Sequence, residues 1–285
     1  VYYRAYFSTP DSMLSPSGEP VNAVRGSLDA LIHLIDRYRP TELAICWDLD
    51  WRPEWRVAEL DTYKTARVAG PDEEQMPDTL SDQVDRLRAV LDELGVHNAG
   101  LDGFEADDVV AQYSRSATSP VWVVSGDRDL FQLVDDSRDV KVLYLGTGVS
   151  KHTVVDDEYL IGKYGIAAGQ YGEFSVLRGD ASDGLPGVKG IGEKTAAALL
   201  REHGSIAQCL AAAKGGSDTI KPRIAQALVD HEDYIARARK VVLLDQELQL
   251  PPLQSTWLNP GESQTLIELG LSRYQARWNA LLAAY

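Results

Sequence analysis

The chain has 285 residues, only two cysteines and a formal net charge of −15 at pH 7. This length suffices for one large domain or two moderate ones without disulfides, and we expect a cytoplasmic protein because we find neither a signal peptide nor an apolar run of about 18 residues. The negative charge repels nucleic acid at long range, so composition alone argues against a DNA-binding protein.

In the first half of the chain, short apolar runs alternate with longer helical patterns. We expect strands at residues 43–47, 95–99, 121–124 and 141–145, and helices at residues 24–38, 80–94 and 107–116. This alternation predicts an α/β fold, a mostly parallel sheet flanked by helices. The active site of such a sheet lies beyond the carboxyl ends of its strands, where Asp48 and the segment 125–129 follow two of the predicted strands.

From about residue 157 onward the strand signal is lost. We expect helices at residues 157–164, 171–178, 193–203, 205–213, 221–230 and 233–242, then a strand-like piece at 249–252 and two further helices. The sequence therefore predicts an α/β domain over residues 1–156, a helical domain over 157–248 and a C-terminal segment, 249–285, that packs back on the first domain. Residues 67–78 are polar and rich in Gly and Pro, and we expect the most mobile segment there.

Acidic residues gather in four clusters. They are Asp48; Glu105, Asp107 and Asp108; Asp127 and Asp129; and Asp180 and Asp183. Each cluster alone has an ordinary interpretation, as a turn or as the acidic first turn of a helix. Together they favour a metal site, because massed carboxylates repel one another unless cations share the site, and oxygen ligands without His or Cys suit Mg²⁺ or Mn²⁺.

The spacing within two clusters supports this interpretation. Glu105 and Asp108 lie three residues apart, so a helix places them on one face. Asp127 and Asp129 point the same way if their segment is extended. Two ions about 4 Å apart at such a site would activate water and stabilise the leaving oxygen of a phosphoryl displacement.

A glycine-rich segment, residues 187–192, precedes the helical pattern that starts at Glu193. It predicts a helix–hairpin–helix, in which glycines allow close backbone approach and N–H groups at the start of the second helix bind a phosphate. It is not a Walker A loop, because Glu193 separates Gly192 from Lys194, and its GxxGxG spacing differs from the dinucleotide fingerprint.

Three segments, FEADDV (104–109), SGDRDLFQ (125–132) and RGDASDGLPGVKGIGEKTA (178–196), resemble in this order the motifs of the bacterial 5′–3′ exonuclease/flap endonuclease family. That family includes the 5′-nuclease domain of DNA polymerase I and free-standing relatives. The resemblance runs from about residue 4 to about residue 245. It implies a PIN-like (resolvase-like) domain followed by a helical H3TH domain, and a structure-specific 5′ nuclease of DNA replication and repair with no polymerase attached.

The resemblance also implies roles for individual residues. One metal cluster would use Asp48, Glu105 and Asp107, and a second would use Asp108, Asp127, Asp129 and Asp183, with Asp180 nearby. In the family's YKxxR signature, here residues 63–67, Lys64 and Arg67 would contact the scissile phosphate and Tyr63 would stack on a terminal base. Further DNA contacts would come from Arg4, Arg56, Gly187, Lys189, Gly190, Gly192 and Lys194, and backbone carbonyls of Val188 and Ile191 would hold K⁺.

The implied substrate is branched or nicked duplex DNA with a single-stranded 5′ flap, cut by a monomer at the nucleoid. The family places one more metal-binding aspartate on a first strand, at a position that precedes Val1. We therefore expect the intact protein to carry a short apolar strand ending in Asp upstream of Val1. A smaller departure is Gly184, where many relatives have Asn.

Two alternatives compete with this interpretation. A haloacid-dehalogenase-type phosphatase would explain Asp48 and Asp50 after an apolar strand, but that family needs Thr or Val where this chain has Trp51. The other alternative is a non-catalytic protein that binds branched DNA and whose metal site has decayed, and the full set of second-site carboxylates argues against it.

Overall fold

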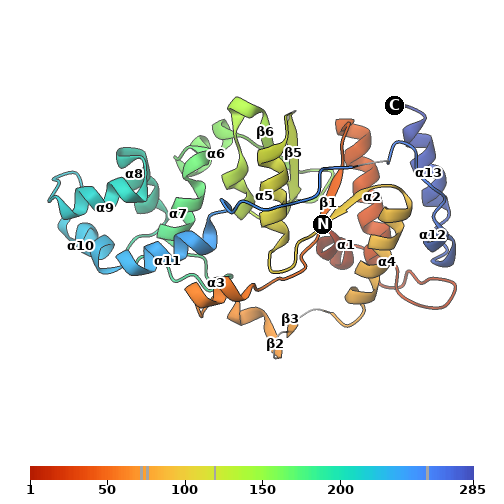
Figure 1. The fold of residues 1–285 in the computed structure, drawn as a ribbon, viewed down its shortest axis with the longest axis horizontal. Helices are drawn as coiled ribbons and strands as arrows, with labels where there is room; N and C mark the ends of the chain where they lie inside the picture. Colours follow the sequence, from red (N-terminus) through yellow and green to blue (C-terminus); the bar gives the residue numbers. More distant parts are fainter. Residues whose placement is uncertain (71–72, 75–76, 119, 255–256) are drawn as a thin grey trace.

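The computed structural model describes residues 1–70, 73–74, 77–118, 120–254 and 257–285. The molecule is elongated (Figure 1), with the main strands in the middle and a group of helices at each end. One end consists of the helices between residues 171 and 242, and the other contains the last two helices and the C-terminus.

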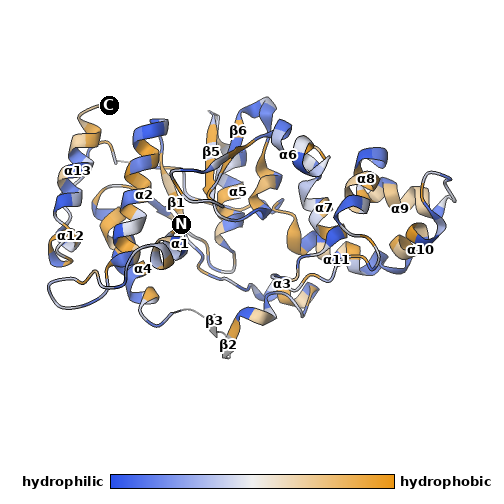
Figure 2. Ribbon diagram, turned by 180° about the vertical axis from the view of Figure 1, so that it is seen from behind, coloured by the Kyte–Doolittle hydropathy of each residue, from blue (hydrophilic) through white to orange (hydrophobic). Residues whose placement is uncertain are grey.

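The central strands form two hydrogen-bonded groups. The first pairs β1 (Ala44–Cys46) with β4 (His97–Ala99) in parallel. The second pairs β5 (Val121–Ser125) with β6 (Val140–Tyr144) in parallel and adds β7 (Thr153–Val155) antiparallel to β6. Figure 2 shows that β5 and β6 are largely hydrophobic, as expected for strands covered on both faces. The predicted mostly parallel sheet is confirmed, and of these central strands the three-residue β7 was not predicted.

Helices on either side enclose these strands. The long α2 (Asn22–Tyr38) and α4 (Leu80–Glu93) share a core with the C-terminal α12 (Gln264–Glu268) and α13 (Arg273–Leu282), and Trp278 is fully buried there. The end of the chain thus packs against helices that come from its beginning.

Between the two strand groups lies α5 (Ala106–Ser116), which contacts both β1 and β5. Its position brings the acidic first turn of the helix to the carboxyl ends of the strands, where the sequence analysis expects the active site.

The second half is helical, as predicted. Its helices are α6 (Asp157–Tyr164), α7 (Tyr171–Arg178), α8 (Glu193–His203), α9 (Ile206–Lys214), α10 (Pro222–Asp230) and α11 (Glu232–Val242). Local signals fix their ends: the side chains of Asp156 and Ser205 accept hydrogen bonds from the first turns of α6 and α9, and α6 and α8 end at Gly165 and Gly204, whose φ angles are positive.

After α11 an extended segment crosses α5 and leads to the C-terminal helices (Figure 1). The predicted strand at 249–252 is wrong, because this part of the chain has no strand partner. Pro251 and Pro252 lack the N–H group that a ladder needs. Side chains of α5 hold the segment instead: Arg115 donates to two of its carbonyls, and the side chain of Gln112 accepts from the N–H of Leu248 at 3.1 Å.

Several short elements are not evident from the sequence. They are α1 (Tyr2–Ser8), α3 (Glu54–Glu59), β2 (Val68–Gly70), β3 (Glu73–Glu74) and the 3₁₀ turns η1 (Thr65–Arg67), η2 (Asp129–Leu133), η3 (Asp136–Arg138) and η4 (Ala168–Gln170). Part of the segment predicted to be mobile, residues 71–72 and 75–76, lies outside the described residues. None of the helices that the structure describes combines the length and the hydrophobicity required to cross a lipid bilayer.

Candidate active site

Five segments that are distant in sequence meet at a small acidic cavity with a volume of about 30 Å³. Five carboxylates and two cationic side chains line it. The lining residues are Tyr63, Lys64, Arg67, Glu105, Asp107, Asp127, Asp129, Asp183, Leu185, Val241, Val242 and Leu244. Of the carboxylates that we expect to converge, Asp107, Asp127, Asp129 and Asp183 line the cavity, whereas Asp108 does not.

The turn after β5 supplies two of these carboxylates. The side chain of Asp127 accepts a hydrogen bond of 2.9 Å from the backbone N–H of Asp129, where η2 begins. The N–H of Asp127 in turn donates to Oγ of Ser125 at 3.0 Å. The segment is therefore a side-chain-stabilised turn rather than the extended chain assumed from sequence, although both carboxylates still reach the cavity.

Burial and mutual repulsion make the cavity unfavourable for negative charge. Burial raises the pKa of the Asp107 carboxyl well above its usual value, and the charge of Asp127 adds to the effect. Burial, followed by Asp127, raises the pKa of Asp129 to about 7. The pKa of Asp183 is also raised by burial, although the neighbouring Arg67 opposes the shift. A cation bound among these groups would favour their charged forms.

The two cationic side chains reach the cavity from the segment before β2. Nζ of Lys64 donates to Glu105 at 2.5 Å and to the carbonyl of Trp51 at 3.1 Å, while Arg67 forms an ion pair with Asp183. The backbone of Lys64 is left-handed, with φ of 51°, and its N–H donates to the carbonyl of Asp183 at 3.0 Å. Such a conformation is costly for a residue with a side chain, so the surrounding contacts must hold it.

The cavity suits small divalent ions in its chemistry and its size. Within the described residues, no three His, Cys, Asp or Glu side chains already surround one point, and two carboxylates pair with Lys64 and Arg67 instead. All of its acidic groups are nevertheless oxygen donors, which hard ions such as Mg²⁺ and Mn²⁺ prefer. At about 30 Å³ the cavity suits small ions rather than an organic ligand, whose pockets have about 300–1,000 Å³.

Three of the acidic residues predicted as ligands do not line the cavity. Asp48 is exposed after the end of β1. Asp180 accepts hydrogen bonds from the N–H and Oγ of Ser182 and lies close enough for its charge to raise the pKa of Asp129. Asp108 is buried, and both of its carboxylate oxygens accept from Arg56 at 2.8 Å. Asp108 therefore does not join the carboxylates that line the cavity, and its role as a metal ligand stays a prediction.

Two residues predicted to contact DNA are also buried. The side chain of Arg56 is 2% exposed, and that of Tyr63 is covered and donates from its hydroxyl to Glu105 at 2.8 Å. Neither can stack on a base or touch a phosphate while it holds these positions. Arg4 is exposed, by contrast, and donates to the carbonyl of Gly146 on the rim of the sheet at 3.3 Å.

The glycine-rich hairpin lies in the helical half. Lys189, Gly190, Gly192 and Lys194 are exposed, whereas the apolar Val188 and Ile191 are buried and anchor the turn. The side chain of Arg223 on α10 also comes near Gly190. Gly187 is buried with φ of 70°, and a side chain there would strike the backbone of Arg178. The carbonyl of Val188 accepts from the N–H of Ile191 at 2.9 Å.

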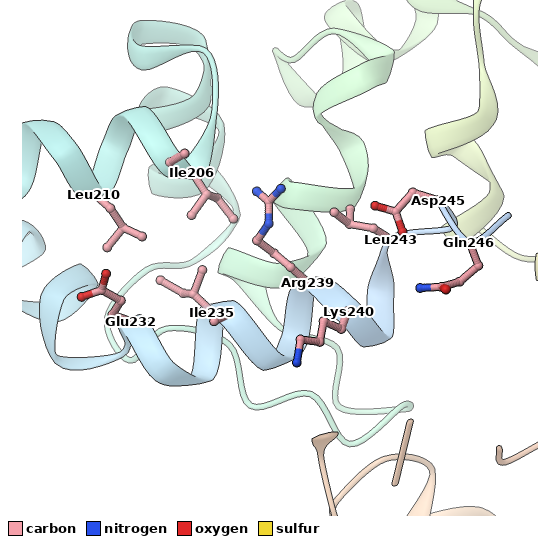
Figure 3. A pocket seen from close by; sticks show the side chains of 11 residues that line it. Ile206, Leu210, Glu232, Ile235, Arg239, Lys240, Leu243, Asp245 and Gln246 are labelled. Atoms are coloured by element: carbon pink, nitrogen blue, oxygen red, sulfur yellow. The ribbon is translucent and has the colours of Figure 1, made fainter. Parts of the chain in front are cut away.

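A larger groove of about 510 Å³ lies between α9 and α11 (Figure 3). Ile206, Leu210 and Ile235 form an apolar floor. The basic residues on its rim are engaged, Arg239 with Glu173 and Lys240 with Glu59. Nothing in its lining points to a particular ligand.

Comparison with known proteins matches almost the whole chain to one family. Residues 1–165 match the family model described as the 5′-3′ exonuclease, N-terminal resolvase-like domain, and residues 166–263 match that of the 5′-3′ exonuclease, C-terminal SAM fold. A 5′-3′ exonuclease of Streptomyces coelicolor is 50% identical over 88% of this chain and 85% of its own length. A 5′-3′ exonuclease of Mycobacterium tuberculosis is 46% identical over 85% of this chain and 80% of its own length.

Solved structures show the same fold at low sequence identity. T5 5′-exonuclease with bound zinc ions superposes with a TM-score of 0.62 at 19% identity, covering 91% of this chain and 90% of that one. The catalytic core of Rad2 in complex with DNA substrate gives a TM-score of 0.56 at 17% identity, covering 98% of this chain and 88% of the other.

Proposed function

The chain belongs to the 5′–3′ exonuclease family, and from this premise we propose that it hydrolyses DNA phosphodiesters where a single-stranded 5′ flap meets a duplex, using two divalent ions. The observation that carries the proposal is the meeting of Asp107, Asp127, Asp129 and Asp183 with Lys64 in one cavity. Family membership contradicts the phosphatase alternative. The presence of all four carboxylates in the cavity argues against the other alternative, a non-catalytic protein whose metal site has decayed.

In this proposal Glu105, Asp107, Asp127, Asp129 and Asp183, which all line the cavity, hold the ions. Mg²⁺ or Mn²⁺ bound there supplies an activated water and stabilises the leaving oxygen. The support is the oxygen-only donor set of this cavity and its small volume of about 30 Å³. Among the neighbours in fold, the T5 5′-exonuclease carries divalent zinc ions. Which metal serves this chain stays a prediction.

The cationic side chains act on the phosphate. Lys64 and Arg67 line the cavity and hold Glu105 and Asp183 in the absence of substrate. When a scissile phosphate enters, both side chains leave their carboxylate partners and donate to the phosphate oxygens instead. There they stabilise the negative charge that develops in the transition state. The backbone bond between Lys64 and Asp183 keeps the donor segment aligned with the acidic one.

The helical half holds the duplex. Its hairpin exposes Lys189 and Lys194 beside Gly190 and Gly192, and backbone N–H groups at the start of α8 add a site for a phosphate. Of the neighbours in fold, the Rad2 core is known in complex with DNA substrate. Potassium at the carbonyls of Val188 and Ile191, a monomeric state and association with the nucleoid also remain predictions.

A nuclease assay tests the proposal. Purified protein is incubated with 5′-labelled flap, nicked, blunt duplex and single-stranded DNA in Mg²⁺ or Mn²⁺, with EDTA as control. We expect cleavage near the flap junction that EDTA abolishes and that is faster than on blunt duplex or single strands. Equal cleavage of all four substrates would contradict the flap preference, and cleavage in EDTA would contradict the metal mechanism.

A further inference from the structure

Arg56 carries the most completely buried cation near the acidic cavity. It comes from the six-residue α3, and its guanidinium donates to three residues of two other segments. Both terminal nitrogens bind Asp108 at 2.8 Å, one of them also reaches Glu105 at 3.0 Å, and Nε donates to the carbonyl of Val241 at 3.0 Å. Arg56 therefore ties α3 and the first turn of α5 to the end of α11.

Arg56 lies behind the cavity rather than in it. It is absent from the cavity lining, whereas its partners Glu105 and Val241 belong to it. The Glu105 carboxylate is held from two sides: Oε1 by Arg56 and by the hydroxyl of Tyr63 at 2.8 Å, and Oε2 by Lys64. Of these two cations, only Lys64 lines the cavity, where a phosphate can reach it.

We propose that Arg56 is a positioning residue that fixes the Glu105 carboxylate at the metal-binding cavity and locks the first turn of α5 to the end of the DNA-holding helical half. This inference rests on the proposed function, and it replaces the role of DNA contact that the sequence suggests. A shift of α11 relative to α5 moves Val241 and so displaces the guanidinium that orients Glu105.

The chemistry of the pair supports positioning over simple stability. A buried ion pair stabilises a fold little compared with apolar residues of the same size, because desolvating both charges offsets their attraction. The planar guanidinium, however, fixes direction: its two parallel bonds to Asp108 leave the remaining donors aimed at Glu105 and Val241. The N–H of Glu105 also donates to Asp108 at 3.2 Å, which closes the arrangement.

The experiment compares two variants with a control. The double variant Arg56→Met/Asp108→Leu removes both buried charges together, so that the core stays neutral. Arg56→Lys keeps the charge but loses the planar fork. Arg115→Met, on the same α5 but bonded to the carbonyls of Leu244 and Gln246, is the control for the loss of a partly buried arginine. Each is measured for thermal unfolding, for Mn²⁺ affinity by calorimetry, for affinity to flap DNA in EDTA and for single-turnover cleavage.

We expect the double variant to fold and to bind DNA within about twofold of the wild type. Its Mn²⁺ affinity and cleavage rate should each fall by about 10- to 100-fold, the usual loss when the partner of a metal ligand is removed. Arg56→Lys should lie between it and the wild type, which keeps the inference testable if the double variant does not fold. Arg115→Met should leave Mn²⁺ affinity unchanged.

Wild-type Mn²⁺ affinity and cleavage in both Arg56 variants would overturn the proposal and leave Arg56 as a core residue. A loss confined to DNA affinity would overturn it in favour of direct DNA contact. The Mn²⁺ measurement needs no cleavage. If the wild-type protein binds Mn²⁺ but does not cleave flap DNA, the proposed function is refuted. The positioning role is then still decided by the Mn²⁺ affinity of the Arg56 variants relative to the wild type.

Discussion

Gly184 offers a sharp test of how the donor segment joins the acidic one. Its φ is 70°, and a Cβ built on it would lie 1.9 Å from the carbonyl oxygen of Thr62. Two hydrogen bonds join the same two segments. Oγ1 of Thr62 donates to the carbonyl of Gly184 at 2.7 Å, and the N–H of Lys64 donates to the carbonyl of Asp183. The substitution Gly184→Ala must therefore push the segment that presents Lys64 away.

The cost has two parts. A side chain at positive φ costs about 1–2 kcal/mol, and displacing a packed backbone costs about 1–3 kcal/mol. Together these predict a loss of about 2–5 kcal/mol. At about 2–4 °C for each kcal/mol in a chain of this size, the melting temperature should fall by about 4–20 °C, with a central value near 10 °C.

Gly216→Ala is the matched control, because Gly216 has the same φ of 70° but no atom within 4 Å of its would-be Cβ. It should lose only the conformational part, about 1–2 kcal/mol. Thermal unfolding in EDTA measures both variants, and single-turnover cleavage at a temperature where both are folded shows whether Lys64 has moved. If the two variants melt at the same temperature and cleave at the same rate, the close approach of Gly184 to Thr62 is wrong.

The remaining predictions concern the cavity itself. Asp127→Ala should reduce metal-dependent cleavage by orders of magnitude yet leave DNA affinity within a few-fold in a gel-shift assay, since duplex binding depends on phosphate contacts elsewhere; a wild-type rate would remove Asp127 from the site. Lys64→Ala and Arg67→Ala should slow single-turnover cleavage more than they weaken binding, with the β6 residue Lys141→Ala as control; equal losses would make the two residues ordinary phosphate clamps. Because burial and then Asp127 raise the pKa of Asp129 to about 7 from an ordinary value of 3.8, its contribution to the stability of the metal-free protein is present below about pH 4 and is lost as pH rises to about 7. Urea unfolding in EDTA should therefore show wild type losing more stability than Asp129→Asn between pH 5 and 8, and parallel curves would contradict the assignment. Saturating Mn²⁺ should raise the melting temperature of wild type at pH 8 but not that of Asp127→Ala, because binding to the folded state stabilises it by mass action; an equal rise in both would place the metal elsewhere.

Local signals made the helical half predictable. Helices α6, α7 and α8 begin and end at the predicted residues, since their caps and terminal glycines, such as Asp156 and Gly204, act within a few residues of the chain. Two of the four residues at 249–252 are prolines, and a strand also exists only with a partner. The hydroxyl of Tyr113 on α5 donates to the carbonyl of Pro251 instead, at 3.1 Å, and sequence periodicity does not reveal such a partner.

The acidic first turn of α5 shows where motif analysis stops. The spacing of Glu105 and Asp108 correctly predicts that they lie on one side of the helix, but it does not reveal that both bind Arg56. Successive helical residues point about 100° apart, so Asp107 faces the cavity while Asp108 turns away. A motif aligns both aspartates with a family pattern, whereas only the three-dimensional arrangement shows which one meets the cavity.

The net charge of −15 misleads about DNA for a similar reason. At physiological salt, charges are screened beyond about 8 Å, so a phosphate at one surface responds mainly to the charges beside it. Five of the 43 acidic residues line a cavity that suits cations, where bound metal would reverse their effect on DNA. Lys189 and Lys194 are exposed on the hairpin at a distance along the chain from those carboxylates. Composition therefore describes how the whole molecule repels DNA from afar, while the cavity and the hairpin decide whether DNA is bound and cut once it arrives.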